Sequence, residues 1–323
     1  MYIVTGGAGF IGSVIVWRLN QEGIDDILII DDLAQTEKWK NLINRSYKDY
    51  IHKDKFIDLI KKDKFPGKID AIIHMGACSS TTEKDADYLT ENNYKYTKTL
   101  AEYALLKNIR FIYASSAATY GDGSLGFSDD DKFTPELKPL NMYGYSKQMF
   151  DLWVIKQGLI DKVVGLKFFN VFGPNEYHKG EMSSLIFKAY HQIKDTGKIK
   201  LFKSYRSEYK DGEQKRDFVY VKDCMDIIWH LIQNNKVNGI FNLGTGTART
   251  WIDLANAVFY AMEKTPNIEF IDMPENIKSK YQYFTEAKMK KLKSTNCPVN
   301  FRSLEDAVAD YIRNYLSQED PFI

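Results

Sequence analysis

A glycine-rich turn near the start of the chain is the feature that most constrains its fold. Gly6, Gly9 and Gly12 follow the short apolar run Tyr2–Val4 and lead into a helical pattern over Ile11–Gln21. The first glycine permits a tight turn out of the strand, the second lets the backbone approach a pyrophosphate, and the third lets the helix pack closely on the sheet. Because free N–H groups and the positive end of the helix dipole then face an anion, the turn predicts a dinucleotide site.

Short apolar runs alternate with longer segments of helical spacing along most of the chain. Most of the runs are too short for helices and lack alternation, which is typical of parallel strands buried on both faces. This pattern predicts an α/β fold with a Rossmann-type doubly wound parallel sheet and right-handed crossovers. The expected strands are Tyr2–Val4, Ile27–Ile30, Ala71–His74, Phe111–Ala114, Val163–Phe169 and Ile240–Leu243, and the expected helices include Ile11–Gln21, Asp85–Leu106, Ser146–Gln157 and Trp251–Met262.

The pattern loosens after Pro174, where we expect a smaller, interleaved C-terminal lobe that binds the substrate. A chain of 323 residues suits one large domain with such a lobe attached. The lobe contains helical stretches at Ser183–Lys194 and Ser303–Leu316, and a polar segment, Ser204–Lys215, that we expect to be a loop. We expect the dinucleotide-binding domain to comprise residues 1–172 and about 217–248, and the lobe to comprise about 173–216 and 249–323.

Charge and cysteine content exclude several classes of partner. The 44 basic and 43 acidic residues give a net charge of +1, and no basic run resembles a nucleic-acid-binding patch. Cys78, Cys224 and Cys297 are far apart and form no C-x-x-C, which argues against a disulfide framework or a metal site. Without a signal peptide pattern or a long apolar run, we expect a cytoplasmic protein that does not bind a membrane.

Two acids at the end of the second expected strand bear on which dinucleotide is bound. Asp31 is suitably placed for the ribose hydroxyls of the NAD adenosine, and a carboxylate there would repel the 2′-phosphate of NADP. Asp32 follows it, and Lys38 and Lys53 come soon after. Either lysine could neutralise a 2′-phosphate, or could be an ordinary solvated surface charge. The residues alone therefore leave the choice between NAD and NADP open.

Small residues follow the strand Ala71–His74, where an adenosine and a pyrophosphate would lie against the backbone. We interpret Cys78 as a packing residue rather than a nucleophile, and His74 as a core histidine rather than a base. Asn92, in the next helical segment, either reaches the sheet or is an ordinary amide on a helix face. The run of small residues comprises Met75, Gly76, Ala77, Cys78 and Ser79.

Tyr143 and Lys147 form a Y-x-x-x-K pattern, whose spacing places both side chains on one face of a helix. A tyrosine hydroxyl, with a pKa near ~10, is a poor base at neutral pH, and a lysine ammonium beside it stabilises the phenolate. The same lysine can bind the nicotinamide ribose. Ser116 ends a strand and would hydrogen-bond the reacting oxygen. These three residues are the expected catalytic group.

Several segments carry a resemblance to a known family. TGGAGFIG (5–12), YASSAATYG (113–121) and PLNMYGYSK (139–147) resemble the extended short-chain dehydrogenases/reductases. GACSSTTE (76–83), FFNVFGPNEYHKGEM (168–182), KRDFVYVKD (215–223) and YQYFTEA (281–287) are similar to the ADP-glyceromanno-heptose 6-epimerases. The resemblance covers nearly the whole chain. It implies an NADP cofactor, an ADP-heptose substrate, a place in the synthesis of lipopolysaccharide core precursors, and a homopentamer.

The resemblance also implies a mechanism and a set of site residues. The reaction would epimerise ADP-D-glycero-D-manno-heptose to ADP-L-glycero-D-manno-heptose at C6″ through transient oxidation to a ketone, with Tyr143 and Lys179 as the two acid/base residues. The expected cofactor-binding residues are Gly6, Gly9, Phe10, Ile11, Gly12, Asp31, Asp32, Lys38, Lys53, Met75, Gly76, Ala77, Cys78, Ser79, Asn92, Lys147, Val171 and Lys179. The expected substrate-binding residues are Ser116, Asn170, Glu181, Lys188, Leu201, Phe202, Lys203, Ser204, Arg216 and Tyr281.

Alternatives remain for individual residues and for the function. The guanidinium of Arg216 suits a pyrophosphate, because it donates two parallel hydrogen bonds, but an ion pair with Asp217 or Asp223 would also explain it. Tyr281 either stacks on adenine or packs in the protein. Competing functions are another nucleotide-sugar epimerase or 4,6-dehydratase, and a non-catalytic dinucleotide sensor. Dehydratases place Thr-Asp-Glu where this chain has Ser-Ala-Ala (116–118), and such sensors commonly lose the tyrosine or the lysine.

Overall fold

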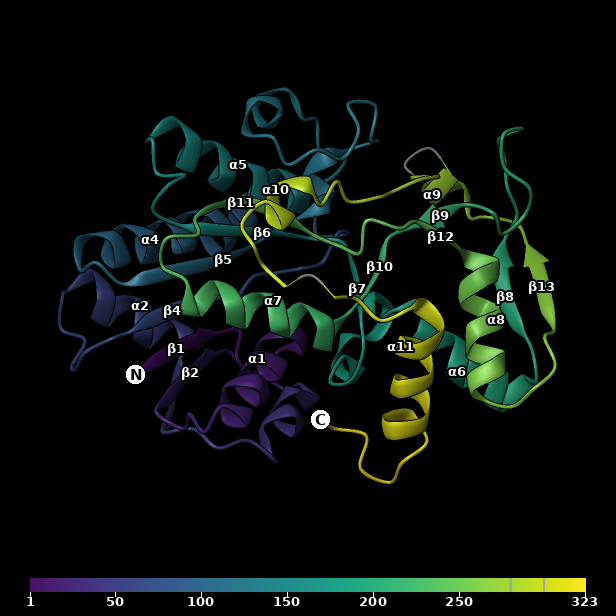
Figure 1. Ribbon diagram of the computed structural model, residues 1–323, viewed down its shortest axis with the longest axis horizontal. Helices are drawn as coiled ribbons and strands as arrows, with labels where there is room; N and C mark the ends of the chain where they lie inside the picture. Colours follow the sequence, from purple (N-terminus) through teal and green to yellow (C-terminus); the bar gives the residue numbers. More distant parts are fainter. Residues whose placement is uncertain (279–280, 299) are drawn as a thin grey trace.

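A parallel sheet forms the centre of the molecule. The computed structural model describes residues 1–278, 281–298 and 300–323, and within them the central sheet has seven strands in the order β11-β6-β5-β4-β1-β2-β3 (Figure 1). Every neighbouring pair in it is parallel. The predicted Rossmann-type fold is confirmed. The strands are β1 (Tyr2–Thr5), β2 (Ile27–Asp31), β3 (Asp49–His52), β4 (Ala71–His74), β5 (Arg110–Ser116), β6 (Val164–Phe168) and β11 (Gly239–Leu243).

Helices cover both faces of this sheet, because successive side chains of each strand point to opposite sides. In β1, Val4 packs in one apolar cluster and its neighbour Ile3 in the other, and Ile73 and Ile72 of β4 divide in the same way. The first cluster includes residues of α1 (Phe10–Gln21) and α7 (Val221–Gln233). The second includes residues of α2 (Lys53–Lys61), α4 (Tyr96–Leu106) and α5 (Met142–Lys156).

A second region packs beyond the carboxyl ends of the strands. Figure 1 shows α6 (Leu185–Thr196) and α8 (Trp251–Ala261) grouped far from α2 and α4. The first apolar cluster continues into this region without a break, through Ala189, Leu254 and Val308. Its strands pair as β7 (Asn170–Phe172) with β10 (Phe218–Tyr220), β8 (Ile199–Phe202) with β13 (Ile268–Ile271), and β9 (Lys215–Arg216) with β12 (Arg249–Thr250).

The chain passes between the sheet and this region more than once, because β11 returns to the sheet edge after β8 to β10. The predicted boundaries of the two lobes stay a prediction. The remaining helices are α3 (Ala86–Leu89), α9 (Glu275–Lys278), α10 (Lys290–Lys293) and α11 (Leu304–Tyr311), with short 3-10 or π-helical turns between elements. None of the helices in the described ranges is long and apolar enough to cross a membrane.

Among the differences from the sequence expectation, three concern the central sheet and the helices that cover it. Helix α5 begins at Met142 rather than at Ser146, because the Asn141 side chain caps it by accepting a hydrogen bond of 2.8 Å from the N–H of Gly144. The helix expected over Asp85–Leu106 is divided by a π-helical turn at Thr90–Lys95. The strand β3 was not expected, since it lies at the sheet edge and its residues are only half-buried.

The cap of α5 generates a first prediction. Asn141→Ala removes the acceptor of the first-turn N–H, so we expect the free energy of unfolding to fall by about 1 kcal/mol. Chemical denaturation measures the change. Asn235→Ala, in an exposed turn, is the control and should leave the stability nearly unchanged. Equal stability of both variants would show that Asn141 does not hold the start of the helix.

Candidate active site

A cavity of about 750 Å³ opens where the central strands end. Parallel α/β sheets bind their ligands at this edge, where the strand order reverses. The cavity joins the glycine turn to the Y-x-x-x-K pair, and its walls come from α1, the loop after β4, the end of β5, α5, β7 and the 3-10 turn Tyr177–Met182. The predicted site residues that line it are Gly6, Gly9, Phe10, Ile11, Gly12, Asp31, Lys38, Met75, Gly76, Ala77, Cys78, Ser79, Ser116, Tyr143, Lys147, Asn170, Val171 and Lys179.

The glycine turn is shaped for a ligand that approaches the backbone. Gly6 has a φ of +66°, and a Cβ added there would lie 2.7 Å from the Cα of Gly76. A Cβ on Gly12 would lie 2.0 Å from the carbonyl oxygen of Gly6, so neither position tolerates a side chain. Gly9 caps the start of α1, and a Cβ there would meet only that same carbonyl, at 3.1 Å. The surface in front of Gly9 is therefore open to a pyrophosphate, which fits a nicotinamide dinucleotide.

Asp31 holds both the glycine turn and a lysine at one end of the cavity. One of its carboxylate oxygens accepts a 2.9 Å hydrogen bond from the N–H of Ala8, and the other lies 2.8 Å from Lys38 Nζ. Asp31 is only 7% exposed, so this ion pair is partly shielded from water. Asp32 does not line the cavity. Lys38 is thus the predicted lysine that reaches the site.

Lys53 and Asn92 lie outside the cavity lining but bond to each other, with Lys53 Nζ 2.7 Å from the Asn92 side-chain oxygen. The neighbouring residue, Asn93, reaches the loop after β4 instead. Its side chain accepts from the N–H of Cys78 and donates to the carbonyl of Cys78, both at 2.9 Å, and donates to Ser146 Oγ at 3.0 Å. It therefore fixes the loop after β4 to α5. No spacing in the sequence distinguished Asn93 from Asn92.

The Y-x-x-x-K pair lies within α5, with Ser116 opposite it at the end of β5. Lys147 Nζ donates a 2.8 Å hydrogen bond to the carbonyl of Ala114. Burial lowers the pKa of Lys147 to about 8, although Asp151 and Cys78 oppose the shift. Burial also raises the pKa of Tyr143, and a hydrogen bond with Ser116 opposes that change. The pKa values of the tyrosine and the lysine, which are ordinarily close, therefore move apart: burial makes Tyr143 hold its proton more firmly and Lys147 hold its proton less firmly.

Lys179 comes from the opposite wall. It lies in the 3-10 turn Tyr177–Met182, and its ammonium sits over the Phe10 ring, 5.1 Å from the centroid. Burial lowers the pKa of Lys179, Glu176 opposes the shift, and Lys188 adds to it. Glu176 is fully buried and anchors the turn by accepting hydrogen bonds from the N–H and hydroxyl of Ser184, at 2.5 and 2.7 Å.

Most of the predicted substrate-binding residues lie outside the cavity lining. The Glu181 side chain is fully exposed and pairs with Lys188 at 3.3 Å. Leu201 is buried within β8, and Ser204 begins the turn-rich segment after it. Their roles in substrate binding stay predictions. The predicted site residues outside the lining are Asp32, Lys53, Asn92, Glu181, Lys188, Leu201, Phe202, Lys203, Ser204, Arg216 and Tyr281.

Arg216 lies between two aromatic rings just behind the lining. Its guanidinium carbon is 5.6 Å from the centroid of Trp251, which does line the cavity, and 5.1 Å from that of Tyr281. It donates to the carbonyls of Lys215, at 2.9 Å, and of Gln282. Tyr281 packs there and accepts a 2.9 Å hydrogen bond from Trp251 Nε1.

The two acids considered as partners of Arg216 are engaged elsewhere. The carboxylate of Asp217 accepts hydrogen bonds from the backbone N–H groups of Thr245, Gly246 and Ala287, and Asp223 pairs with Arg302. The guanidinium of Arg216 is therefore positioned by aromatic rings and carbonyls rather than by a carboxylate.

Comparisons with known proteins agree with this geometry. The model of the NAD dependent epimerase/dehydratase family matches residues 2–244. A protein of Nitratidesulfovibrio vulgaris (strain DP4) named ADP-L-glycero-D-manno-heptose-6-epimerase is 60% identical over 323 residues, the whole of both chains. A Fusobacterium nucleatum protein of the same name is 51% identical over 334 residues, again over the whole of both. The crystal structure of the Helicobacter pylori enzyme of that name shares 25% identity, with 97% of this chain and 95% of that chain covered and a TM-score of 0.82.

The glycine turn generates a second prediction. Gly9 has a φ of −73°, which alanine adopts freely, so Gly9→Ala should fold normally. Its methyl group would occupy the open surface in front of the turn, and we expect the affinity for nicotinamide dinucleotides to fall by about ten-fold or more. Fluorescence titration measures the affinity, and thermal unfolding verifies the fold. Unchanged affinity in a folded variant would place the pyrophosphate elsewhere.

Proposed function

The chain belongs to the NAD dependent epimerase/dehydratase family, and we propose that within it the chain acts as an ADP-L-glycero-D-manno-heptose 6-epimerase. The observation that carries this proposal is that one cavity holds Tyr143 and Lys147 on one wall and Lys179 on another. Identity of 60% with a relative of that name, over the whole of both chains, supports the choice of substrate. The reaction converts ADP-D-glycero-D-manno-heptose to its L-glycero epimer at C6″, a step toward lipopolysaccharide core precursors.

Residues at the two ends of the cavity hold a nicotinamide dinucleotide. The glycine turn and the first turn of α1 receive the pyrophosphate, and the loop after β4 lies against the adenosine. Lys147 binds the nicotinamide ribose. The bound nicotinamide supplies reversible hydride transfer. The protein must therefore supply the proton transfers and the space in which the sugar is oriented.

Inversion at a secondary alcohol explains why two acid/base groups are needed. The carbon must present first one face and then the other to the same side of the cavity, so its oxygen comes to lie against two different walls. A proton-transfer group must be within hydrogen-bond reach of the oxygen, at roughly 2.6–3.2 Å, so one side chain cannot easily serve both positions. Tyr143, assisted by Lys147 and Ser116, serves one position. Lys179 serves the other, since burial lowers its pKa.

Finer assignments complete the proposal. Lys38 lines the cavity beside Asp31, which supports NADP as the cofactor, with Lys38 neutralising the 2′-phosphate. Arg216 and Tyr281, which pack with Trp251, would hold the ADP-heptose after a local rearrangement that brings them to the ligand. The family resemblance supports a homopentamer in the cytoplasm.

A third prediction tests the choice of cofactor. Replacing Lys38 and Lys53 together with alanine should weaken NADP binding by about ten-fold more than NAD binding, because only NADP carries the 2′-phosphate. Isothermal titration with both dinucleotides measures the difference. Lys53→Ala alone is the matched control: since Lys53 lies outside the cavity lining, most of the effect should come from Lys38. Equal losses for NAD and NADP would contradict the 2′-phosphate role.

A fourth prediction tests the two acid/base residues. Tyr143→Phe and Lys179→Met should each lower the rate of epimerisation by about 10²–10⁴-fold, because each removes a proton-transfer group. Nuclear magnetic resonance of purified ADP-heptose follows the conversion, and dinucleotide titration verifies that the site is intact. Lys194→Met, at an exposed lysine of α6, is the control and should retain full activity. A fully active Lys179→Met would exclude the second acid/base residue, and an inactive parent protein would exclude the proposed function.

A further inference from the structure

One ion pair lies fully buried behind the catalytic wall of the cavity. Lys167 Nζ of β6 is 2.8 Å from Asp151 Oδ2 of α5, and the two side chains are 1% and 0% exposed. Neither residue lines the cavity. Burying two charges is costly, and an apolar pair of similar size often stabilises a fold equally well. Stability alone therefore gives a weak reason for this pair.

The pair forms hydrogen bonds with residues at the end of β5 and in the turn that follows it. The Asp151 carboxylate accepts hydrogen bonds from Ser115 Oγ at 2.7 Å and from Tyr113 OH at 2.9 Å. Lys167 Nζ donates to Thr119 Oγ1 at 2.7 Å, and Thr119 donates in turn to the carbonyl of Ser116 at 2.8 Å. The ammonium also lies over the Tyr120 ring. Ser116 is thus fixed through its own backbone, and its hydroxyl, which accepts a 3.1 Å hydrogen bond from the N–H of Ala118, lies at the cavity.

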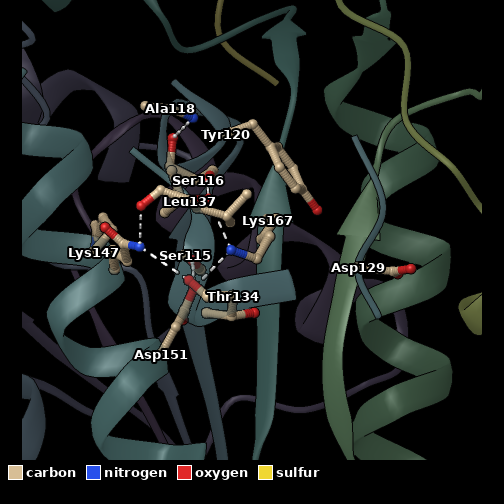
Figure 2. Close-up of polar contacts among 12 residues, drawn as sticks. Ser115, Ser116, Ala118, Tyr120, Asp129, Thr134, Leu137, Lys147, Asp151 and Lys167 are labelled. Atoms are coloured by element: carbon tan, nitrogen blue, oxygen red, sulfur yellow. Dashed lines mark hydrogen bonds and ion pairs between the residues drawn. The ribbon is translucent and has the colours of Figure 1, made fainter. Parts of the chain in front are cut away.

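Asp151 also lies under the catalytic lysine. Tyr143, Lys147 and Asp151 are spaced by four residues each, so they follow one face of α5. Figure 2 shows the carboxylate of Asp151 beside the end of Lys167, and the Ser115 hydroxyl that bonds this carboxylate is adjacent in the chain to Ala114, whose carbonyl accepts from Lys147. Asp151 favours the protonated form of Lys147, opposing the effect of burial. Lys167 pairs with Oδ2 of the same carboxylate and balances its charge.

We propose that Asp151 and Lys167 are positioning residues for the reaction assigned above: Asp151 keeps Lys147 protonated, and Lys167 limits how strongly it does so. The pair therefore sets the charge of the catalytic lysine, while its hydrogen bonds fix Ser116 opposite Tyr143. This role rests on the proposed function, but the charge of Lys147 can be measured without enzymatic turnover.

The other charged or titratable groups around Lys147 are few in the described residues. Tyr143 and Asp151 face it from α5, Cys78 from the loop after β4, and His74 from β4, with Lys167 of β6 behind Asp151. Burial lowers the pKa of His74 to about 3, and Lys147 contributes to that shift. His74 therefore stays neutral across the range in which Lys147 titrates. The thiol of Cys78 is removed from the titration by working in a Cys78→Ser background as well as in the parent.

The test measures the titration of Lys147 in the full-length protein without added dinucleotide. Acetic anhydride reacts only with the neutral amine, so the extent of acetylation at Lys147, read by mass spectrometry after a short pulse, rises with pH through its pKa. In Asp151→Asn/Lys167→Met both charges of the pair are gone. Because Asp151 lies one helical turn from Lys147 on α5, its loss dominates, and we expect the midpoint to move to lower pH by about 1 unit. In Lys167→Met alone we expect it to move to higher pH, because the carboxylate is no longer balanced.

A matched control distinguishes this role from simple support of the fold. Asp310→Asn breaks another ion pair, with Lys222, that lies 17–22% exposed and away from the cavity lining. It should leave the Lys147 midpoint in place even if it lowers the melting temperature. The double variant removes both charges of the buried ion pair together, so we expect it to fold even if Lys167→Met does not.

Several results would overturn the proposal. These are an unchanged Lys147 midpoint in the folded double variant, a lower midpoint in Lys167→Met, or a double variant that cannot fold, which would make the pair structural only. The alkaline limb of the epimerisation rate should shift in the same direction as the labelling midpoint. If the parent protein labels as expected but converts no ADP-heptose, the proposed function fails while the control of Lys147 by the pair stands.

Discussion

The close approach of two backbones, at Gly6 and Gly76, is the contact on which the site depends. No side chain fits between them, and the N–H groups of Met75 and Gly76 donate to the carbonyl and the hydroxyl of Thr5, at 3.1 and 3.2 Å. The ends of β1 and β4 are thereby joined at the point where the strand order reverses. The loops after these strands diverge from that point, and the cavity lies between them and the second region of the chain.

The opposite wall is tied back to the same turn. Asn175, which is fully buried, donates to Ser13 Oγ at 2.9 Å, and Asn41 donates to the carbonyl of Ala8 at 2.8 Å and to that of Asn175 at 3.2 Å. The turn that carries Lys179 is therefore held by hydrogen bonds to α1 and to the glycine turn before it. Each wall holds a lysine whose pKa is lowered by burial. A buried carboxylate opposes that shift on each wall, Asp151 at Lys147 and Glu176 at Lys179.

Local spacing predicted the parts of the fold and site that depend on neighbouring residues. The glycine turn and the Tyr143–Lys147 pair are encoded within a few positions, so their geometry follows from one turn or one helix. The partners of Asp151 could not be predicted in this way, because Lys167 comes from another strand and its pairing depends on the register of the sheet. Asn93 was missed because a π-helical turn changes which amide faces the loop. Arg216 finds its partners in Trp251 and Tyr281, which are distant in sequence.

The repeated passage of the chain between the central sheet and the second region has a consequence for how the molecule unfolds. Neither region is built from one continuous stretch, and a single apolar cluster extends through both. A fragment cut at any one loop would expose part of that shared core and lack strands needed to cover it. We therefore expect the two regions to melt together in one cooperative transition, and we expect neither to fold as a free-standing module.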